Sequence, residues 1–116
     1  MDERQGFLKA LAKNEDDTTT RMVYADWLDE RGEHEESDRQ RKWPAAKTWL
    51  VEFAERHSVG YSELIDAIVS GEGLCFGDLD GPEAMENPEV WKNLEIVTGK
   101  RFTSDERENI HFRCAC

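Results

Sequence analysis

The sequence has few of the features that mark a membrane protein, a secreted protein or a disulfide-stabilised one. Its 116 residues include only three Cys and three Pro, and no apolar run approaches the roughly 20 residues of a transmembrane helix. An odd number of Cys excludes a complete set of internal disulfides, so reduced thiols are expected. The first residues also lack the pattern of a signal peptide. We therefore expect a cytoplasmic protein that does not insert into a membrane.

Basic residues are also scarce. The chain has 26 acidic residues against 15 Lys and Arg, which gives a formal net charge of −11. Residues 1–42 carry 12 acids and eight bases, and residues 43–116 carry 14 acids and seven bases. Nucleic acids and anionic membranes are bound through cations that face phosphate groups, so we expect neither as a partner. An acidic surface favours a basic protein surface instead.

Apolar residues at helical spacing, together with helix start and stop signals, dominate what is present. They predict a mainly α fold, a small single-domain helical bundle of about five or six helices, with a short β-hairpin near the C-terminal tail. Trp43 precedes Pro44, which disfavours helical geometry at Trp43, so we expect a break or kink there. The predicted helices cover residues 3–13, 19–31, 35–43, 44–57, 62–70 and 88–98, with another start at Thr103 or Ser104.

The predicted helix over residues 19–31 has the clearest pattern. Asp17 or Thr18 is a natural N-cap, and Gly32 is the expected left-handed stop. Asp26 lies at the edge of the apolar stripe, where an acid is usually paired, so we expect a structural salt bridge or cap. The stripe that we expect to face inward consists of Val23, Tyr24, Trp27 and Leu28.

Five segments within residues 7–41 form a recognisable pattern: Phe7-Leu8, Asp16-Asp17, Arg21-Met22-Val23, Tyr24-Ala25-Asp26-Trp27-Leu28 and Asp29-Glu30-Arg31-Gly32. With these segments, residues 7–41 resemble the repeat-companion domain, a short bacterial module. Two departures are Asn14-Glu15, where such proteins often have a Pro, and Gln40-Arg41, which lacks the usual Ile. The resemblance implies an interaction or scaffold module with no established activity, and no catalytic residue is carried over.

The sequence therefore divides into a repeat-companion-like helical module over residues 1–42 and a helical C-terminal region over residues 43–116. The second region contains an irregular Gly- and Pro-rich loop at residues 70–88. Such loops are disproportionately functional or mobile. We expect the two regions to pack in one domain.

Four residues form a candidate metal site: Cys75, His111, Cys114 and Cys116. A Cys₃His set is sufficient for tetrahedral zinc, although this spacing is not one of the standard ones. The alternative is a packed tail with structurally inert thiols. The acidic loop around Asp78 and Asp80 lacks the first-position Asp and twelfth-position Glu of a calcium loop, and is expected to be a solvated turn.

The sequence also offers a candidate nucleophile and a candidate surface anchor. Cys75 with His57 or His111 as base would make a Cys-dependent enzyme, which is a weaker alternative because nothing in the sequence shows that they are close. Trp43 stands off any apolar stripe and is a candidate surface anchor for a partner, since Trp residues are common binding hot spots. The alternative for Trp43 is to fill a joint between helices. The leading expectation is a non-enzymatic protein-interaction or adapter module that needs no cofactor.

Overall fold

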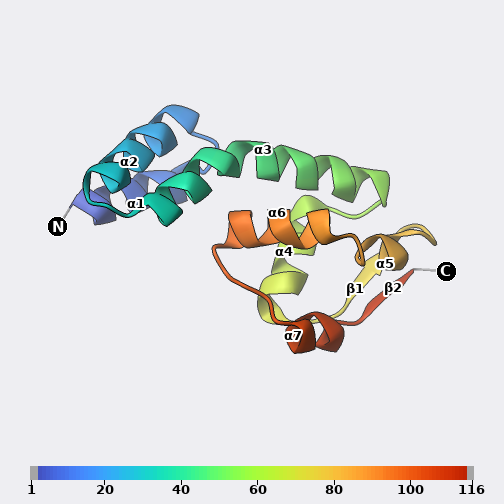
Figure 1. Ribbon diagram of the computed structural model, residues 1–116. Coiled ribbons are helices and arrows are strands. Elements are labelled where there is room, and N and C mark those ends of the chain that lie inside the picture. Colours follow the sequence, from blue (N-terminus) through green and yellow to red (C-terminus); the bar gives the residue numbers. More distant parts are fainter. Residues whose placement is uncertain (1–2, 115–116) are drawn as a thin grey trace. The chain divides into compact units, whose positions relative to one another are not determined.

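The computed structural model describes residues 3–114, with side chains over residues 3–113 (Figure 1). Seven helices and one pair of short strands make up this part of the chain, so the prediction of a mainly α fold is confirmed. None of the described helices is long and apolar enough to cross a membrane. The elements are α1 (Glu3–Lys13), α2 (Thr18–Glu30), α3 (His34–Arg56), α4 (Tyr61–Ser70), β1 (Leu74–Phe76), α5 (Gly81–Ala84), α6 (Pro88–Thr98), α7 (Ser104–Asn109) and β2 (Phe112–Cys114).

The chain divides into two compact units, Met1–Ala45 and Ala46–Cys116. The division falls inside α3, three residues beyond the boundary predicted after residue 42. The first half of α3 therefore belongs with α1 and α2, and its second half belongs with α4 to α7 and the strands.

Most helix ends follow the signals in the sequence. The Asp17 carboxylate accepts a hydrogen bond from the amide of Thr20 and caps α2, and Asn87 caps α6 in the same way through the amide of Glu89. Gly32, Gly71 and Gly99 all have positive φ, which glycine adopts without the steric cost that other residues incur. These glycines end α2, α4 and α6, as predicted.

Of the expected break or kink at Trp43 and Pro44, the break is wrong, because α3 runs through Pro44 as one helix of 23 residues. Pro44 has no N–H to donate to the Gln40 carbonyl, a loss that costs about 3 kcal/mol or more inside a helix. Side chains on both sides of the Pro are buried, including Trp43, Ala46 and Leu50. Their burial outweighs the lost hydrogen bond and keeps the flanking turns helical.

The first unit has a small aromatic core between α1 and α2. Leu11, Tyr24 and Leu28 are buried, and Phe7 and Trp27 pack against them. The Phe7 and Tyr24 rings stack with their centroids 5.1 Å apart. The prediction that Val23 faces inward is wrong, since Val23 is 51% exposed. One residue turns a helix by about 100°, so Val23 lies to the side of the face that Tyr24 and Leu28 share.

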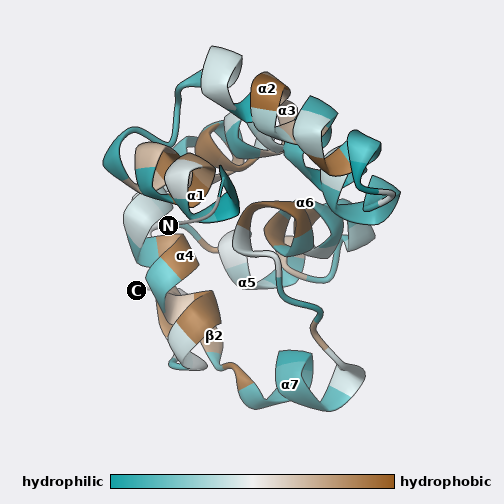
Figure 2. Ribbon diagram, turned by 90° about the vertical axis from the view of Figure 1, so that its left-hand side faces the viewer, coloured by the Kyte–Doolittle hydropathy of each residue, from teal (hydrophilic) through white to brown (hydrophobic). Residues whose placement is uncertain are grey.

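The second unit holds a larger apolar core, which contains Leu50, Phe53, Leu64, Phe76 and Trp91 among its members. Figure 2 shows the apolar residues of α4 and α6, whereas α7 is largely hydrophilic and contributes no buried residue. The Trp91 indole N–H donates a hydrogen bond of 2.7 Å to the Met85 carbonyl, which satisfies its polar atom inside this core.

The strand pair is parallel, so the expected hairpin is wrong. β1 pairs with β2 in the register Leu74↔Phe112, Cys75↔Arg113 and Phe76↔Cys114. A hairpin joins adjacent antiparallel strands, whereas parallel strands require a long crossover. Here the crossover consists of α5, α6 and α7, and it brings the C-terminal tail beside the Gly-rich loop.

Candidate functional site

Trp43 lies inside the molecule and is only 6% exposed, which contradicts the prediction that it is a surface anchor. The guanidinium carbon of Arg21 lies 3.7 Å from the centroid of the Trp43 ring. This distance is well within the range of a cation–π interaction, which strengthens when the cation is removed from water. Trp43 therefore covers a buried cation in the first unit.

Arg21 is 4% exposed and is the most buried charged residue among those described. Its Nη1 donates to the Gln40 side-chain oxygen at 2.6 Å, and its Nη2 donates to the Glu15 carbonyl at 2.8 Å. Its buried Nε has no hydrogen-bond partner among the described residues. Burial lowers the pKa of Arg21 below its ordinary value of 12.5, and the neighbouring Arg39 cation adds to this effect.

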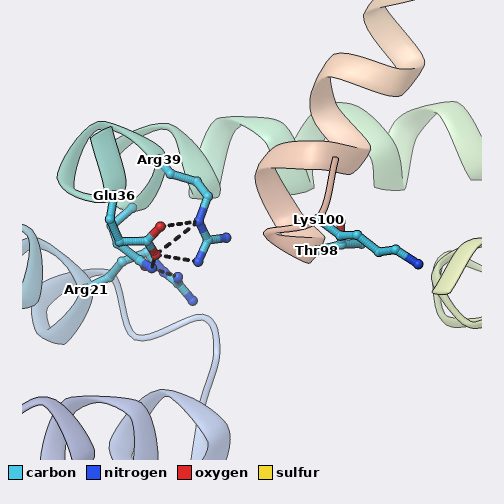
Figure 3. A network of polar contacts seen from close by, with 6 residues as sticks. Arg21, Glu36, Arg39, Thr98 and Lys100 are labelled. Carbon is cyan, nitrogen blue, oxygen red and sulfur yellow. Dashed lines mark hydrogen bonds and ion pairs between the residues drawn. The ribbon is translucent and has the colours of Figure 1, made fainter. Parts of the chain in front are cut away.

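A chain of hydrogen bonds continues from Arg21 along α3. The Gln40 amide donates to Glu36 at 2.9 Å, and Arg39 makes a bidentate contact with the same carboxylate, with distances of 2.6–3.1 Å. Figure 3 shows these side chains gathered around Glu36. Burial raises the pKa of Glu36, but the hydrogen bonds from Arg39 and Gln40 outweigh burial and leave this pKa below its ordinary value of 4.5. The network holds α2 against the first half of α3.

A second polar network lies on the surface of the first unit. Nη2 of Arg41 donates to Asp26 at 2.7 Å and to Asp29 at 2.8 Å, which joins α2 to α3. The prediction that Asp26 forms a structural salt bridge is therefore confirmed. Hydrogen bonds from Arg41, His34 and Ser37 lower the pKa of Asp29 to about 2.

Both networks consist of groups that fix helices. Arg21, Asp26, Asp29 and Arg41 each contact a residue on a different element or loop. A carboxylate bound to an arginine stays ionised and is a poor general acid or base near neutral pH, where a catalytic group needs a pKa close to the operating pH. These residues are therefore suited to holding the helices of a scaffold in place.

The residues of the predicted zinc set lie around the strand pair. The exposed thiol of Cys75 on β1 accepts a hydrogen bond from Nε of Arg113 at 3.0 Å. His111 directly precedes β2, and its carbonyl accepts from the amide of Leu74 at 2.8 Å. The Cys114 backbone is in register with Phe76, but the Cys114 side chain and all of Cys116 lie outside the described residues.

The parallel pairing therefore joins two segments that are far apart in the sequence and carry the predicted ligands. Within the part of the chain that the structure describes, no group of three or more His, Cys, Asp or Glu side chains is placed to hold a metal ion. Because two of the four predicted ligands fall outside that part, zinc binding stays a prediction.

The suggested pair of Cys75 and His57 does not form. Side chains alternate along β1, so Leu74 and Phe76 are buried and Cys75 is exposed on the other side. The His57 ring contacts Phe76 on the buried side, with ring centroids 6.2 Å apart. Strand geometry therefore directs the thiol away from this imidazole.

His57 has a different partner, which the sequence did not reveal. Its buried ring lies against Phe53, and its Nδ1 is 3.0 Å from a carboxylate oxygen of Asp78. Asp78 also accepts a hydrogen bond from the amide of Gly81 at 2.8 Å, at the start of α5. The expected solvated turn is thus fastened to the end of α3. The only signal for this contact is an acid in a Gly-rich loop, which does not identify a partner 21 residues away.

The sequence also does not reveal the polar contacts of Arg21. An Arg between Thr20 and Met22 on a predicted helix gives no indication that it is buried. Its burial becomes evident only once the packing shows which side of α2 faces α3.

Comparison of the chain with protein-family models, with curated proteins and with solved structures finds no match.

Proposed function

We propose that this chain is a non-enzymatic protein-interaction or adapter module of the bacterial cytoplasm. The observation that carries the proposal is the use of polar residues in the first unit. Arg21, Asp26, Asp29 and Arg41 bind one another or neighbouring helices, and their geometry fits a scaffold that presents a surface. The resemblance of residues 7–41 to the repeat-companion domain supports the same function.

The exposed residues of the first unit also favour a binding role. Leu8 and Val23 are large apolar residues that are 48% and 51% exposed. Single exposed apolar residues are common on any protein and carry little weight alone. In combination with a net charge of −11, they favour partners that offer both apolar contacts and positive charge.

Co-purification from native cells tests the proposal. A tagged copy of the full chain is expected to retain one or more proteins in near-equal amounts. A Leu28→Asp variant should lose them, because Leu28 is fully buried in the first unit and its replacement by a charge disrupts the fold. A tagged Glu30→Ala variant is the matched control, since Glu30 is an exposed residue on the same helix. If wild type and Leu28→Asp retain the same proteins, or neither retains any, the proposal is wrong.

A small zinc-binding protein is the second candidate, because the parallel pairing of β1 with β2 places two segments that carry predicted ligands side by side. The same register pairs the Cys114 position with buried Phe76, on the face opposite to Cys75, so the tail would have to turn its second thiol for both to bind one ion. This pairing brings the Cys75 strand beside the segment that contains His111 and Cys114, although 35 residues or more separate them in the sequence. Zinc would be held by thiolates and an imidazole, which are its preferred ligands. The hydrogen bond from Arg113 to the Cys75 sulfur is compatible with such a site, because a thiolate has three lone pairs and a metal ion takes one of them.

Native mass spectrometry distinguishes the two candidates. Zinc binding predicts one equivalent of metal, lost in Cys75→Ser and in Cys114→Ser and retained in His34→Ala, which removes an exposed imidazole outside the set. Three titratable thiols in a metal-free chain purified with added zinc would exclude the zinc site. The interaction module is unaffected by that outcome.

A further inference from the structure

The turn between β1 and α5 exposes a leucine. Leu79 is 75% exposed, which is more than any other large apolar side chain in the described part of the chain. It belongs to the segment Gly77–Gly81, which we name the Leu79 turn. A single exposed leucine is ordinary on a protein surface, so an inference about Leu79 must rest on its surroundings as well.

The Leu79 turn is fastened on both sides of the leucine. Before it, the amide of Gly77 donates to the His57 carbonyl at 3.1 Å. Asp78 binds the His57 ring at 3.0 Å and accepts from the amide of Gly81 at 2.8 Å. All of these contacts lie within the second unit. The backbone that carries Leu79 is therefore held in place on the end of α3.

Close packing at two glycines reinforces this anchorage. A Cβ atom on Gly77 would lie 2.4 Å from the Cβ of Ser58, and one on Gly81 would lie 2.2 Å from the Cγ of Phe76. Both distances are shorter than real Cβ contacts, so the turn fits against the unit only because these residues have no side chains. A turn held in this way cannot fold Leu79 inward without releasing these contacts.

The stretch of chain that contains the turn carries charge of one sign. Residues 58–91 contain eight acidic residues and no Lys, Arg or His. Of these acids, Asp78 alone has an ion pair among the described residues, with His57. Asp80, Glu83 and Glu86 follow Leu79 closely in the chain and are all exposed. An exposed apolar residue that is followed along the chain by exposed acids matches a surface of the opposite charge that also offers an apolar contact.

We propose that the Leu79 turn is a docking surface for a basic amphipathic segment of a partner protein. An apolar side chain of that segment packs on Leu79, and its Lys or Arg residues pair with Asp80, Glu83 and Glu86. The preformed turn reduces the ordering cost of binding. This surface presupposes the proposed function as an interaction module and names the partner's chemistry.

A random peptide library displayed on phage supplies the probe. The purified full chain is used to select peptides at about 0.05 M NaCl, where exposed charges are weakly screened. Selected peptides are then synthesised, and their affinity for each variant is measured by fluorescence anisotropy. We expect them to be rich in Lys or Arg and to contain an apolar residue.

Two serine variants provide the decisive comparison. Leu79→Ser should weaken peptide binding about tenfold or more, because it removes the apolar contact and leaves every nearby charge in place. Val69→Ser is the matched control: Val69 is 54% exposed, belongs to the same acid-only stretch, and should bind the peptides as wild type does. Circular dichroism confirms that both variants are folded. The charge contribution is measured with the triple variant Asp80→Asn, Glu83→Gln, Glu86→Gln, which should also bind at least tenfold more weakly.

Three outcomes would overturn the docking surface: selected peptides without excess positive charge, equal affinity for Leu79→Ser and wild type, or equal weakening by Val69→Ser. Failure to select any peptide would count in the same way. None of these results touches the co-purification test of the interaction module, which depends on the whole chain. A partner retained equally by wild type and Leu79→Ser would therefore leave the module intact and place its binding surface elsewhere.

Discussion

Arg21 illustrates how the first unit uses a charge as a structural element. A buried cation is costly unless its donors are satisfied, and here two hydrogen bonds and the Trp43 ring offset that cost. The side chain reaches from α2 to α3 and to the carbonyl of Glu15 in the preceding turn. It thus connects three segments of the first unit, in addition to the ion pairs of Arg41 with Asp26 and Asp29.

Replacing Arg21 by Met should therefore destabilise the protein although the apolar volume is largely kept. Gln40 would lose its donor while staying buried, and the carbonyl of exposed Glu15 would lose one as well, so we expect a loss of about 2 kcal/mol in the free energy of unfolding. Urea unfolding measures this value. Arg31→Met is the control, since Arg31 is exposed and stacks over Trp27, and it should cost less than about 1 kcal/mol. Equal losses in the two variants would show that burial of Arg21 is not what matters.

Asp29 provides a prediction for acidic solution. Its pKa falls from the ordinary value of 3.8 to about 2 in the folded protein, chiefly through the hydrogen bond from Arg41. A lowered folded-state pKa stabilises the protein above the unfolded-state pKa, and this contribution is lost as the pH falls through the folded-state value. The difference in urea midpoint between wild type and Asp29→Asn should thus be constant above about pH 5 and should shrink between about pH 4 and pH 2. A difference that grows in this window would contradict the assignment.

Residue pairs differ in how far the sequence predicts them. The salt bridge of Asp26 is predictable because an acid at the edge of an apolar stripe needs a cation, although the sequence does not say that Arg41 supplies it. Trp43 is misjudged because its ring is buried by packing with Arg21, a residue that itself shows no sign of burial in the sequence. The pairing of His57 with Asp78 is likewise decided by tertiary contacts.

At the scale of elements, α3 contains a Pro in its interior and still continues. The amide that Pro44 lacks would otherwise donate to the Gln40 carbonyl, and Gln40 also takes part in the Arg21 network. Pro44→Ala restores the donor and should raise the free energy of unfolding by about 1–2 kcal/mol, after allowing for the greater freedom of Ala in the unfolded chain. Urea unfolding with detection by circular dichroism is the measurement. A loss of stability would show that contacts of the Pro44 ring outweigh the restored hydrogen bond.

The sequence predicts where helices end better than it predicts which strands pair. The caps at Asp17 and Asn87 and the stops at Gly32, Gly71 and Gly99 are local, so the sequence predicts them within a residue or two. The partner of β2 is not local, because it lies 36 or more residues earlier in the chain. A three-residue strand carries too little pattern to choose between a hairpin and a parallel crossover.

At the scale of the whole molecule, the two units handle charge differently. The first unit pairs many of its acids with bases, as in the contacts of Arg41 with Asp26 and Asp29, of Arg39 with Glu36 and of Lys42 with Asp38. The second unit contains the acid-only stretch at residues 58–91. Salt screens attraction and repulsion alike, so added salt should slightly destabilise the first unit and stabilise the second.

Hydrogen exchange measured by mass spectrometry tests this difference between the units. Raising NaCl from about 0.02 M to about 0.5 M shortens the screening length from roughly 20 Å to roughly 4 Å. Amides in α4 and α6 should gain protection, because repulsion among the acids of the second unit is relieved. Amides in α2 should keep or slightly lose protection, because its exposed ion pairs weaken, each by less than about 1 kcal/mol. Sucrose, which stabilises both units without screening charge, serves as the control. A uniform gain in both units with NaCl would mean that general salt effects, and not the uneven pairing of charge along the chain, govern stability.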